Sequence, residues 1–180
     1  VTQFIQWILV GMTSSLAQAS VPVEHLEMVL RAGQETKPLT QWTLAELKKV
    51  GVVEIQEVLP GKSEKFRFRG ARLAQLIDQA MAPLTAEQRS QVDLLVLYGK
   101  GGRALLPRAF AQKSPILIAF DRNGKALATE DGGPLLSVLP WTSNVKIQKE
   151  GAPLEAFFVR GLEKIELSNY RQSMGNIFLK

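Results

Sequence analysis

The sequence predicts an α+β domain with a mixed, mainly antiparallel sheet and a few short helices. Many short apolar runs are bounded by Gly, Pro and Asn-Gly turns, as expected of short strands. A few helical segments interrupt these runs, but not in the regular alternation that a parallel sheet requires. With 180 residues and 46% hydrophobic composition, the chain is long enough to bury the core of one domain.

Period-2 alternation and turn residues locate the strands. In Lys62 to Arg72 (KSEKFRFRGAR), basic residues alternate with Phe66 and Phe68, which predicts a strand with one exposed basic face. Asn123-Gly124 joins two apolar runs and predicts a type I′ hairpin turn. We expect strands over residues 25–32, 52–59, 64–69, 93–98, 103–106, 114–121 and 134–140, and one or two more within 156–167, where Gly161 is a candidate bulge.

Capping residues and an apolar stripe predict the helices. In 40–50 (TQWTLAELKKV), Thr43 is a suitable N-cap, and Glu46 three residues later completes a capping box. In 70–81, apolar residues recur at helical spacing and form one stripe. The stripe consists of Leu73, Leu76, Ile77 and Ala80. Shorter helical turns are expected over 85–90 and 107–113, the second starting at a proline.

The first 19 residues have the composition of a signal peptide. They contain no charged side chain, include an apolar run from Phe4 to Met12, and end in Ala17-Gln18-Ala19, which fits the A-x-A cleavage pattern. The run is shorter than the roughly 20 apolar residues that span a bilayer. No Lys or Arg precedes it, so an N-terminal amphipathic helix of the folded domain is the alternative. We expect an exported periplasmic protein whose mature chain begins near Ser20 and has no transmembrane segment.

The expected organisation has four parts. They are a signal peptide at 1–19, an N-terminal strand and linker at 20–39, the main domain at 40–168 and a C-terminal tail at 169–180.

Several kinds of site are disfavoured by residue content. The chain has no cysteine, which excludes disulfides and thiolate ligands. With a single histidine, His25, neither a zinc site nor a catalytic triad is expected. The net charge of +5 is spread along the chain, and no base-stacking or groove-entering element accompanies it, so nucleic acid is not an expected partner.

Two further patterns are interpreted as structural. Gly99-Lys100-Gly101-Gly102 lacks the glycine spacing and the following Ser or Thr of a phosphate-binding loop, so we expect a turn. Glu54 with Glu57, or Asp121 with Asp131, could form an acid–base pair, but carboxylates at exposed strand positions are usually only solvated.

Four short motifs follow one another in a distinctive order. They are Phe68-Arg69-Gly70 leading into the 70–81 helix, Asn123-Gly124-Lys125 after a strand, Gly132-Gly133-Pro134 before another, and Ile165-Glu166-Leu167 at the end of the last. In this order, over about residues 40 to 168, they resemble the oxidoreductase molybdopterin-binding domain, which has the sulfite-oxidase fold. The chain is most similar to the short, exported members of that family that consist of this domain alone.

The resemblance does not extend to the catalytic residues. In catalytic members a cysteine just before the helix ligates molybdenum, whereas Val52 to Lys65 contains neither a cysteine nor the Gly-Asn turn that usually follows it. Glu130-Asp131-Gly132 occupies the place where active members often carry a histidine, and acidic side chains there repel a pterin phosphate. No other evident ligand suits molybdenum-dithiolene chemistry. We therefore expect no catalytic residue, no metal ligand and no cofactor.

The expected function is that of a non-catalytic ligand-binding, sensory or accessory module. The alternatives are a molybdopterin-dependent oxidoreductase with an atypical, cysteine-free site, and a purely structural domain. Expected partners are a small anionic ligand or a membrane-bound sensor protein. Guanidinium groups suit carboxylates and phosphates, so the candidates for an anion-binding cleft are Arg69, Arg103, Arg108 and Arg122, which lie near strand and turn ends.

Overall fold

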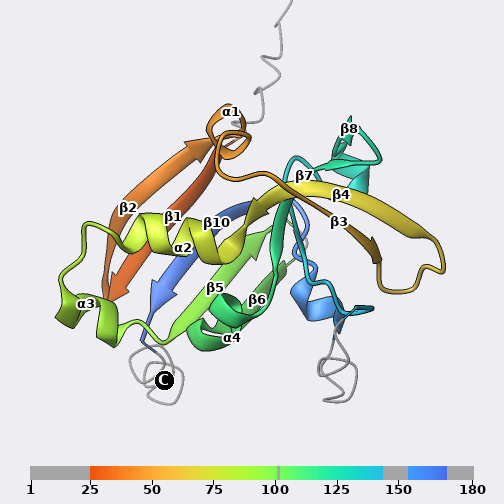
Figure 1. The fold of residues 1–180 in the computed structure, drawn as a ribbon. Helices are drawn as coiled ribbons and strands as arrows, with labels where there is room; N and C mark the ends of the chain where they lie inside the picture. The colour runs from red at the N-terminus through yellow and green to blue at the C-terminus, as the bar shows by residue number, and fades with distance from the viewer. Residues whose placement is uncertain (1–24, 101, 144–153, 170–180) are drawn as a thin grey trace, which may run out of the picture.

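The computed structural model describes residues 25–100, 102–143 and 154–169, in which the strands form two five-stranded sheets (Figure 1). The first sheet has the order β2-β1-β10-β5-β6. β1 and β10 are parallel, and the other neighbours are antiparallel. The strands are β1 (His25–Ala32), β2 (Glu35–Thr43), β5 (Leu94–Gly99), β6 (Gly102–Pro107) and β10 (Leu162–Ser168).

The second sheet is antiparallel, with the order β3-β4-β7-β8 and with β9 also paired to β7. Its strands are β3 (Val53–Val58), β4 (Lys65–Arg72), β7 (Leu117–Arg122), β8 (Lys125–Ala126) and β9 (Leu136–Val138). The helices are α1 (Leu44–Leu47), α2 (Leu73–Met81), α3 (Ala86–Gln91) and α4 (Arg108–Lys113), with 3₁₀ turns η1 (Thr129–Asp131) and η2 (Leu154–Phe157). The predicted α+β class, with mainly antiparallel pairing and short helices, is confirmed.

The helix α2 packs its apolar stripe against the first sheet. Leu73, Leu76 and Ile77 are fully buried and share one core with side chains of β1, β5 and β10. Figure 1 shows α2 and α4 over one face of that sheet. The predicted stripe is confirmed, but the helix begins at Leu73 rather than at Gly70. Residues 70–72 instead belong to β4 and pair with β7.

The glycine of Phe68-Arg69-Gly70 permits a close approach between β4 and β7. A Cβ atom at Gly70 would lie 2.2 Å from the carbonyl oxygen of Ile118, far inside van der Waals contact. The register of the two strands also shifts between Arg69 and Gly70, as at a bulge. Backbone packing therefore explains this part of the motif without any ligand.

The hairpin predicted at Asn123-Gly124 is confirmed. Both residues have positive φ, 54° and 82°, as a type I′ turn requires. They connect β7 to β8, with Arg122 opposite Lys125. The turn also contacts β4 through two hydrogen bonds. The Asn123 side-chain oxygen accepts the backbone N–H of Arg67 at 2.9 Å, and the backbone N–H of Asn123 donates to the Arg67 carbonyl at 2.7 Å.

The strand β2 lies where the sequence predicted a linker and the first residues of a helix. Its residues are mostly polar and exposed, because β2 is an edge strand. It therefore lacks both the alternation of apolar and polar residues and the apolar content that mark a buried strand. Pro38 is also tolerated at an edge. The predicted helix is short and begins only after Thr43, whose capping box with Glu46 is confirmed.

The strand expected over 134–140 is confirmed in its central part as β9. Leu136, Ser137 and Val138 are all buried and pair with β7. At the C-terminal end of the domain, Gly161 has a φ of 56°, and the β10 register shifts close by, between Leu162 and Lys164. The predicted signal peptide lies outside the described residues, as does the C-terminal tail beyond Asn169. No helix within the described parts of the chain is long and apolar enough to cross a membrane.

Candidate functional site

The segment in which the family resemblance expects a thiolate ligand forms most of the β3–β4 hairpin. Glu57, on β3, is fully buried. Its Oε1 accepts the N–H of Val58 at 2.8 Å, and its Oε2 accepts the N–H of Thr142 at 3.1 Å. The expectation that Glu57 is a solvated carboxylate is therefore wrong. The chain that follows β9 lies against this end of β3, where the Trp141 indole N–H also donates to the Val58 carbonyl at 2.9 Å.

The donors on this hairpin do not fit a molybdenum-dithiolene group. The resemblance implies a cysteine thiolate as the protein ligand of such a group, and the chain contains no cysteine. The buried carboxylate of Glu57 offers hard oxygen atoms, both of which accept backbone N–H groups. In the parts of the chain that the structure describes, no three His, Asp or Glu side chains gather as a metal site. Through its contact with Thr142, Glu57 joins β3 to the chain that follows β9.

The acidic residues before Gly132 are partly neutralised. Asp131 forms an ion pair with Arg122, at 2.5 Å between Oδ2 and Nη2. The Arg122 guanidinium also lies over the ring of Phe66, 5.0 Å from its centre. Asp121 has a separate role, because its carboxylate accepts the N–H of Gly124 in the hairpin turn at 2.9 Å. Each aspartate thus supports local structure.

The four arginines proposed for an anion cleft are distributed over the fold. Arg69 and Arg122 lie on β4 and β7 of the second sheet. Arg103 lies on β6, an edge strand of the first sheet, and Arg108 begins α4 directly after β6. Arg69 and Arg103 are exposed, whereas Arg122 is engaged by Asp131. The structure therefore does not bring the four together in one cleft.

Of these four, Arg108 lines a groove together with an arginine that was not predicted, Arg89 of α3. The groove has a volume of about 420 Å³, and its other lining residues are Asp78, Met81 and Gln112. It lies where α2, α3 and α4 face one another. The volume falls within the range of about 300–1,000 Å³ that is usual for small-molecule sites.

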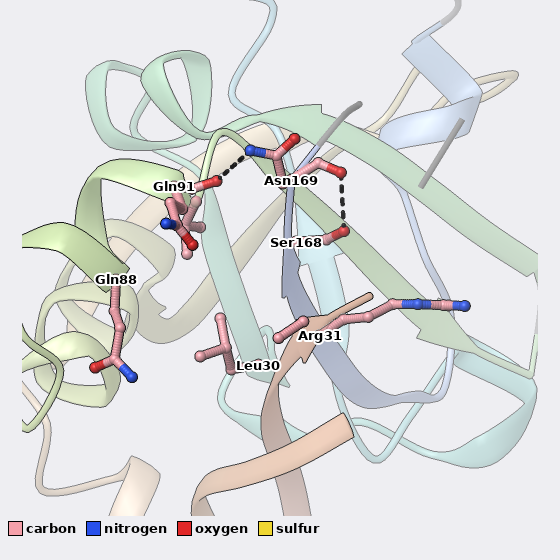
Figure 2. Close-up of a pocket in the computed structure, with 8 residues that line it drawn as sticks. Leu30, Arg31, Gln88, Gln91, Ser168 and Asn169 are labelled. Atoms are coloured by element: carbon pink, nitrogen blue, oxygen red, sulfur yellow. Dashed lines mark hydrogen bonds between the residues drawn. The ribbon is translucent and has the colours of Figure 1, made fainter. Parts of the chain in front are cut away.

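A second, smaller pocket lies between α3 and the ends of β1 and β10 (Figure 2). Its volume is about 130 Å³, and its polar lining is mostly engaged. The Asn169 side chain donates to the Gln91 carbonyl at 2.9 Å, and the Ser168 hydroxyl donates to the Asn169 carbonyl at 3.4 Å. In Figure 2 the Arg31 guanidinium extends away from the other lining residues. The pocket is therefore too small for most organic ligands and offers few free polar groups.

Arg31 belongs instead to a charged cluster on the first sheet. Its Nη1 lies 3.5 Å from a carboxylate oxygen of Glu166, a residue that is 4% exposed on β10. The Tyr98 hydroxyl donates to the other Glu166 oxygen at 3.4 Å. Burial raises the pKa of Tyr98, and the negative charge of Glu166 raises it further. The cluster joins β1, β10 and β5, so its arrangement is that of a structural network.

His25 is half-buried at the start of β1. Its Nδ1 is buried, with no hydrogen-bond partner among the described residues. It pairs in register with Thr43 of β2. This setting gives no support to a catalytic histidine.

Sequence reasoning missed Glu57 as a buried group and Arg89 as a groove residue. The alternation of β3 places Val53 and Ile55 on the same strand face as Glu57, and that spacing was an available signal for its burial. For Arg89 no local signal exists, because the groove depends on how three helices pack.

Comparisons with known proteins identify the fold. No protein-family model matches the sequence, and no curated protein matches it either. Among solved structures, the chain is similar to the sulfane dehydrogenase SoxCD from Paracoccus pantotrophus, with a TM-score of 0.55 and 15% sequence identity. The alignment covers 80% of this chain but only 38% of that chain. The chain therefore shares the fold of a sulfite-oxidase-like protein.

Proposed function

We propose that this protein is an exported, non-catalytic binding or accessory module on a sulfite-oxidase-like fold. The observation that carries the proposal is the β3–β4 hairpin, which contains no thiolate and in which the buried Glu57 carboxylate accepts two backbone N–H groups. A molybdenum site of the kind that the resemblance implies would need a cysteine thiolate on this hairpin, and the chain contains no cysteine.

The non-catalytic part of the proposal is tested by cofactor content. The protein would be produced in a host that makes molybdenum cofactor, denatured, and assayed for released pterin by fluorescence. We expect no pterin above the background of a cofactor-free control protein, and no oxidase or reductase turnover. Stoichiometric pterin, with turnover that depends on it, would instead support a molybdopterin-dependent oxidoreductase with a cysteine-free site.

The export part of the proposal rests on residues 1–19 and has a separate test. Signal peptidase accepts small side chains at the third position of the A-x-A pattern, which Ala19 occupies. We predict that the exported protein begins near Ser20 and that Ala19→Phe blocks this processing. N-terminal sequencing of the periplasmic fraction measures both, and an exported protein that retains residues 4–12 would refute export by cleavage.

A further inference from the structure

We propose that the groove between α2, α3 and α4 binds a small acidic amino acid through Arg89, Arg108 and Asp78. This inference rests on the proposed binding function and assigns it a site and a ligand class. The groove is formed by residues of three helices, and its lining includes two guanidinium groups, one carboxylate and one side-chain amide.

Backbone carbonyl groups position both arginines. The Nε of Arg89 donates to the Leu84 carbonyl at 2.9 Å, and its Nη2 donates to the Ala82 carbonyl at 3.4 Å. The Nη1 of Arg108 donates to the Arg89 carbonyl at 2.6 Å. These contacts hold the guanidinium planes in place without consuming all of their five donors each. Hydrogen bonds that orient a side chain before a ligand arrives reduce the freedom lost on binding, which lowers its entropic cost.

Neither arginine of this pair forms an ion pair in the described part of the chain. Within the described part of the chain, ion pairs are formed by Arg31, Arg67, Lys100 and Arg122, but neither Arg89 nor Arg108 lies within 4.0 Å of a carboxylate oxygen. Neutral carbonyl groups accept their hydrogen bonds instead. Guanidinium groups with free donors bind carboxylates in paired geometry, so two carboxylate groups suit this side of the groove.

The remaining polar groups favour a ligand that also carries a cation. Asp78 of α2 accepts a weak hydrogen bond from the Gln112 side-chain amide at 3.4 Å, and the exposed carboxylate retains acceptor capacity. A ligand ammonium group can bind there while its carboxylates bind the arginines. A dicarboxylic amino acid has two carboxylates and one ammonium group. Its charges are therefore opposite in sign to the two guanidinium groups and the one carboxylate of the lining.

The test is an NMR titration of the ¹⁵N-labelled protein, following arginine Nε–H and backbone amide signals. Succinate and L-aspartate have the same carbon skeleton and differ by the ammonium group. In N-acetylaspartate the acetyl group removes the charge of that ammonium group. Inorganic phosphate tests whether any small anion binds. We expect L-aspartate to bind most tightly. Because the groove is open to solvent and salt-screened, Arg89→Gln and Arg108→Gln should each weaken binding about three- to tenfold.

Two further variants test the site without depending on the stability of the arginine variants. Asp78→Asn should remove the preference for L-aspartate over succinate, and Arg103→Gln, on β6 outside the groove lining, should leave binding unchanged. The proposal is contradicted if no probe gives saturable shifts, or if Asp78→Asn and Arg108→Gln bind L-aspartate as the wild type does. That failure would leave the cofactor measurement unaffected, whereas bound pterin would contradict the proposed function whatever the groove binds.

Discussion

At the scale of single residues, Glu57 is a carboxylate with a structural task. It is fully buried, and its two oxygens accept the N–H groups of Val58 and Thr142. A buried carboxylate is tolerated when backbone donors satisfy it. The same strand carries Glu54 at an exposed position, so two glutamates three residues apart have opposite environments.

Glu57→Ala should destabilise the protein, because it leaves two backbone N–H groups without acceptors. Each partly buried unsatisfied group costs about 1–3 kcal/mol, so we expect a loss of about 2–4 kcal/mol in the free energy of unfolding, measured by denaturant titration. Glu54→Ala is the matched control. It removes only a surface ion pair with Arg67 at 3.8 Å and should cost no more than about 0.5 kcal/mol. Equal losses of unfolding free energy in the two variants would show that the contacts of Glu57 do not stabilise the fold.

The environment of Tyr98 predicts how the stability of the protein changes at alkaline pH. Burial, followed by the charge of Glu166, raises the pKa of Tyr98 above its ordinary value of 10.0. The folded protein therefore holds the phenolic proton more tightly than the unfolded chain does. The associated stability is present below pH 10 and is lost as the pH rises through the higher folded pKa.

The Tyr98 prediction is checked by ultraviolet absorbance of tyrosinate. The sequence has two tyrosines, so Tyr170→Phe leaves Tyr98 as the single phenol in the titration. Its midpoint should lie above that of the same variant in denaturant. In addition, Tyr98→Phe should lose less stability than the wild type above pH 10. A midpoint equal to that of the unfolded chain would contradict the buried contact with Glu166.

At the scale of elements, α2 joins the two sheets. It follows β4 directly, and its buried stripe packs in the core of the first sheet. Leu76→Ala should cost about 2–5 kcal/mol of unfolding free energy, because a cavity remains in a well-packed core. Gln79→Ala, exposed on the same helix, should stay within about 0.5 kcal/mol. Thermal or denaturant unfolding measures both, and similar effects would mean that the buried face is misassigned.

The elements that sequence predicted well are those whose signal is local. The Asn123-Gly124 turn depends on positive φ at two residues, and the Thr43–Glu46 capping box depends on three-residue spacing. Both can be read from neighbouring residues. β2 was missed because an edge strand needs little apolar content and its partner is set by the fold. The predicted start of α2 was too early because Gly70 belongs to β4. That strand pairs with β7, which is distant in sequence.

The candidate site was predicted less well than the fold. Arg108 was among the predicted anion contacts, but its groove partner Arg89 was not. Arg69, Arg103 and Arg122 lie elsewhere. Strand and turn ends can be located from sequence, but which ends meet depends on strand order. Here that order includes the parallel pairing of β1 with β10, from opposite ends of the described chain.

At the scale of the whole molecule, the chain combines a sulfite-oxidase-like fold with a β3–β4 hairpin that contains no cysteine. Packing explains the features that made the sequence resemble the family. Gly70 permits the β4–β7 approach, Asn123-Gly124 forms the turn, and β9 is a buried strand paired with β7. Each of these residues therefore has a packing or turn-forming role in this fold.

The molybdenum content of the protein, isolated with its native maturation machinery, distinguishes a non-catalytic module from a molybdenum enzyme. Elemental analysis of the folded, purified protein gives moles of metal per mole of chain, with a cysteine-containing molybdenum enzyme from the same host as the positive control. We expect the control to be loaded with molybdenum, whereas this protein, although folded, should contain molybdenum at background level. Stoichiometric molybdenum in this protein would show instead that a cysteine-free site on this fold holds the metal.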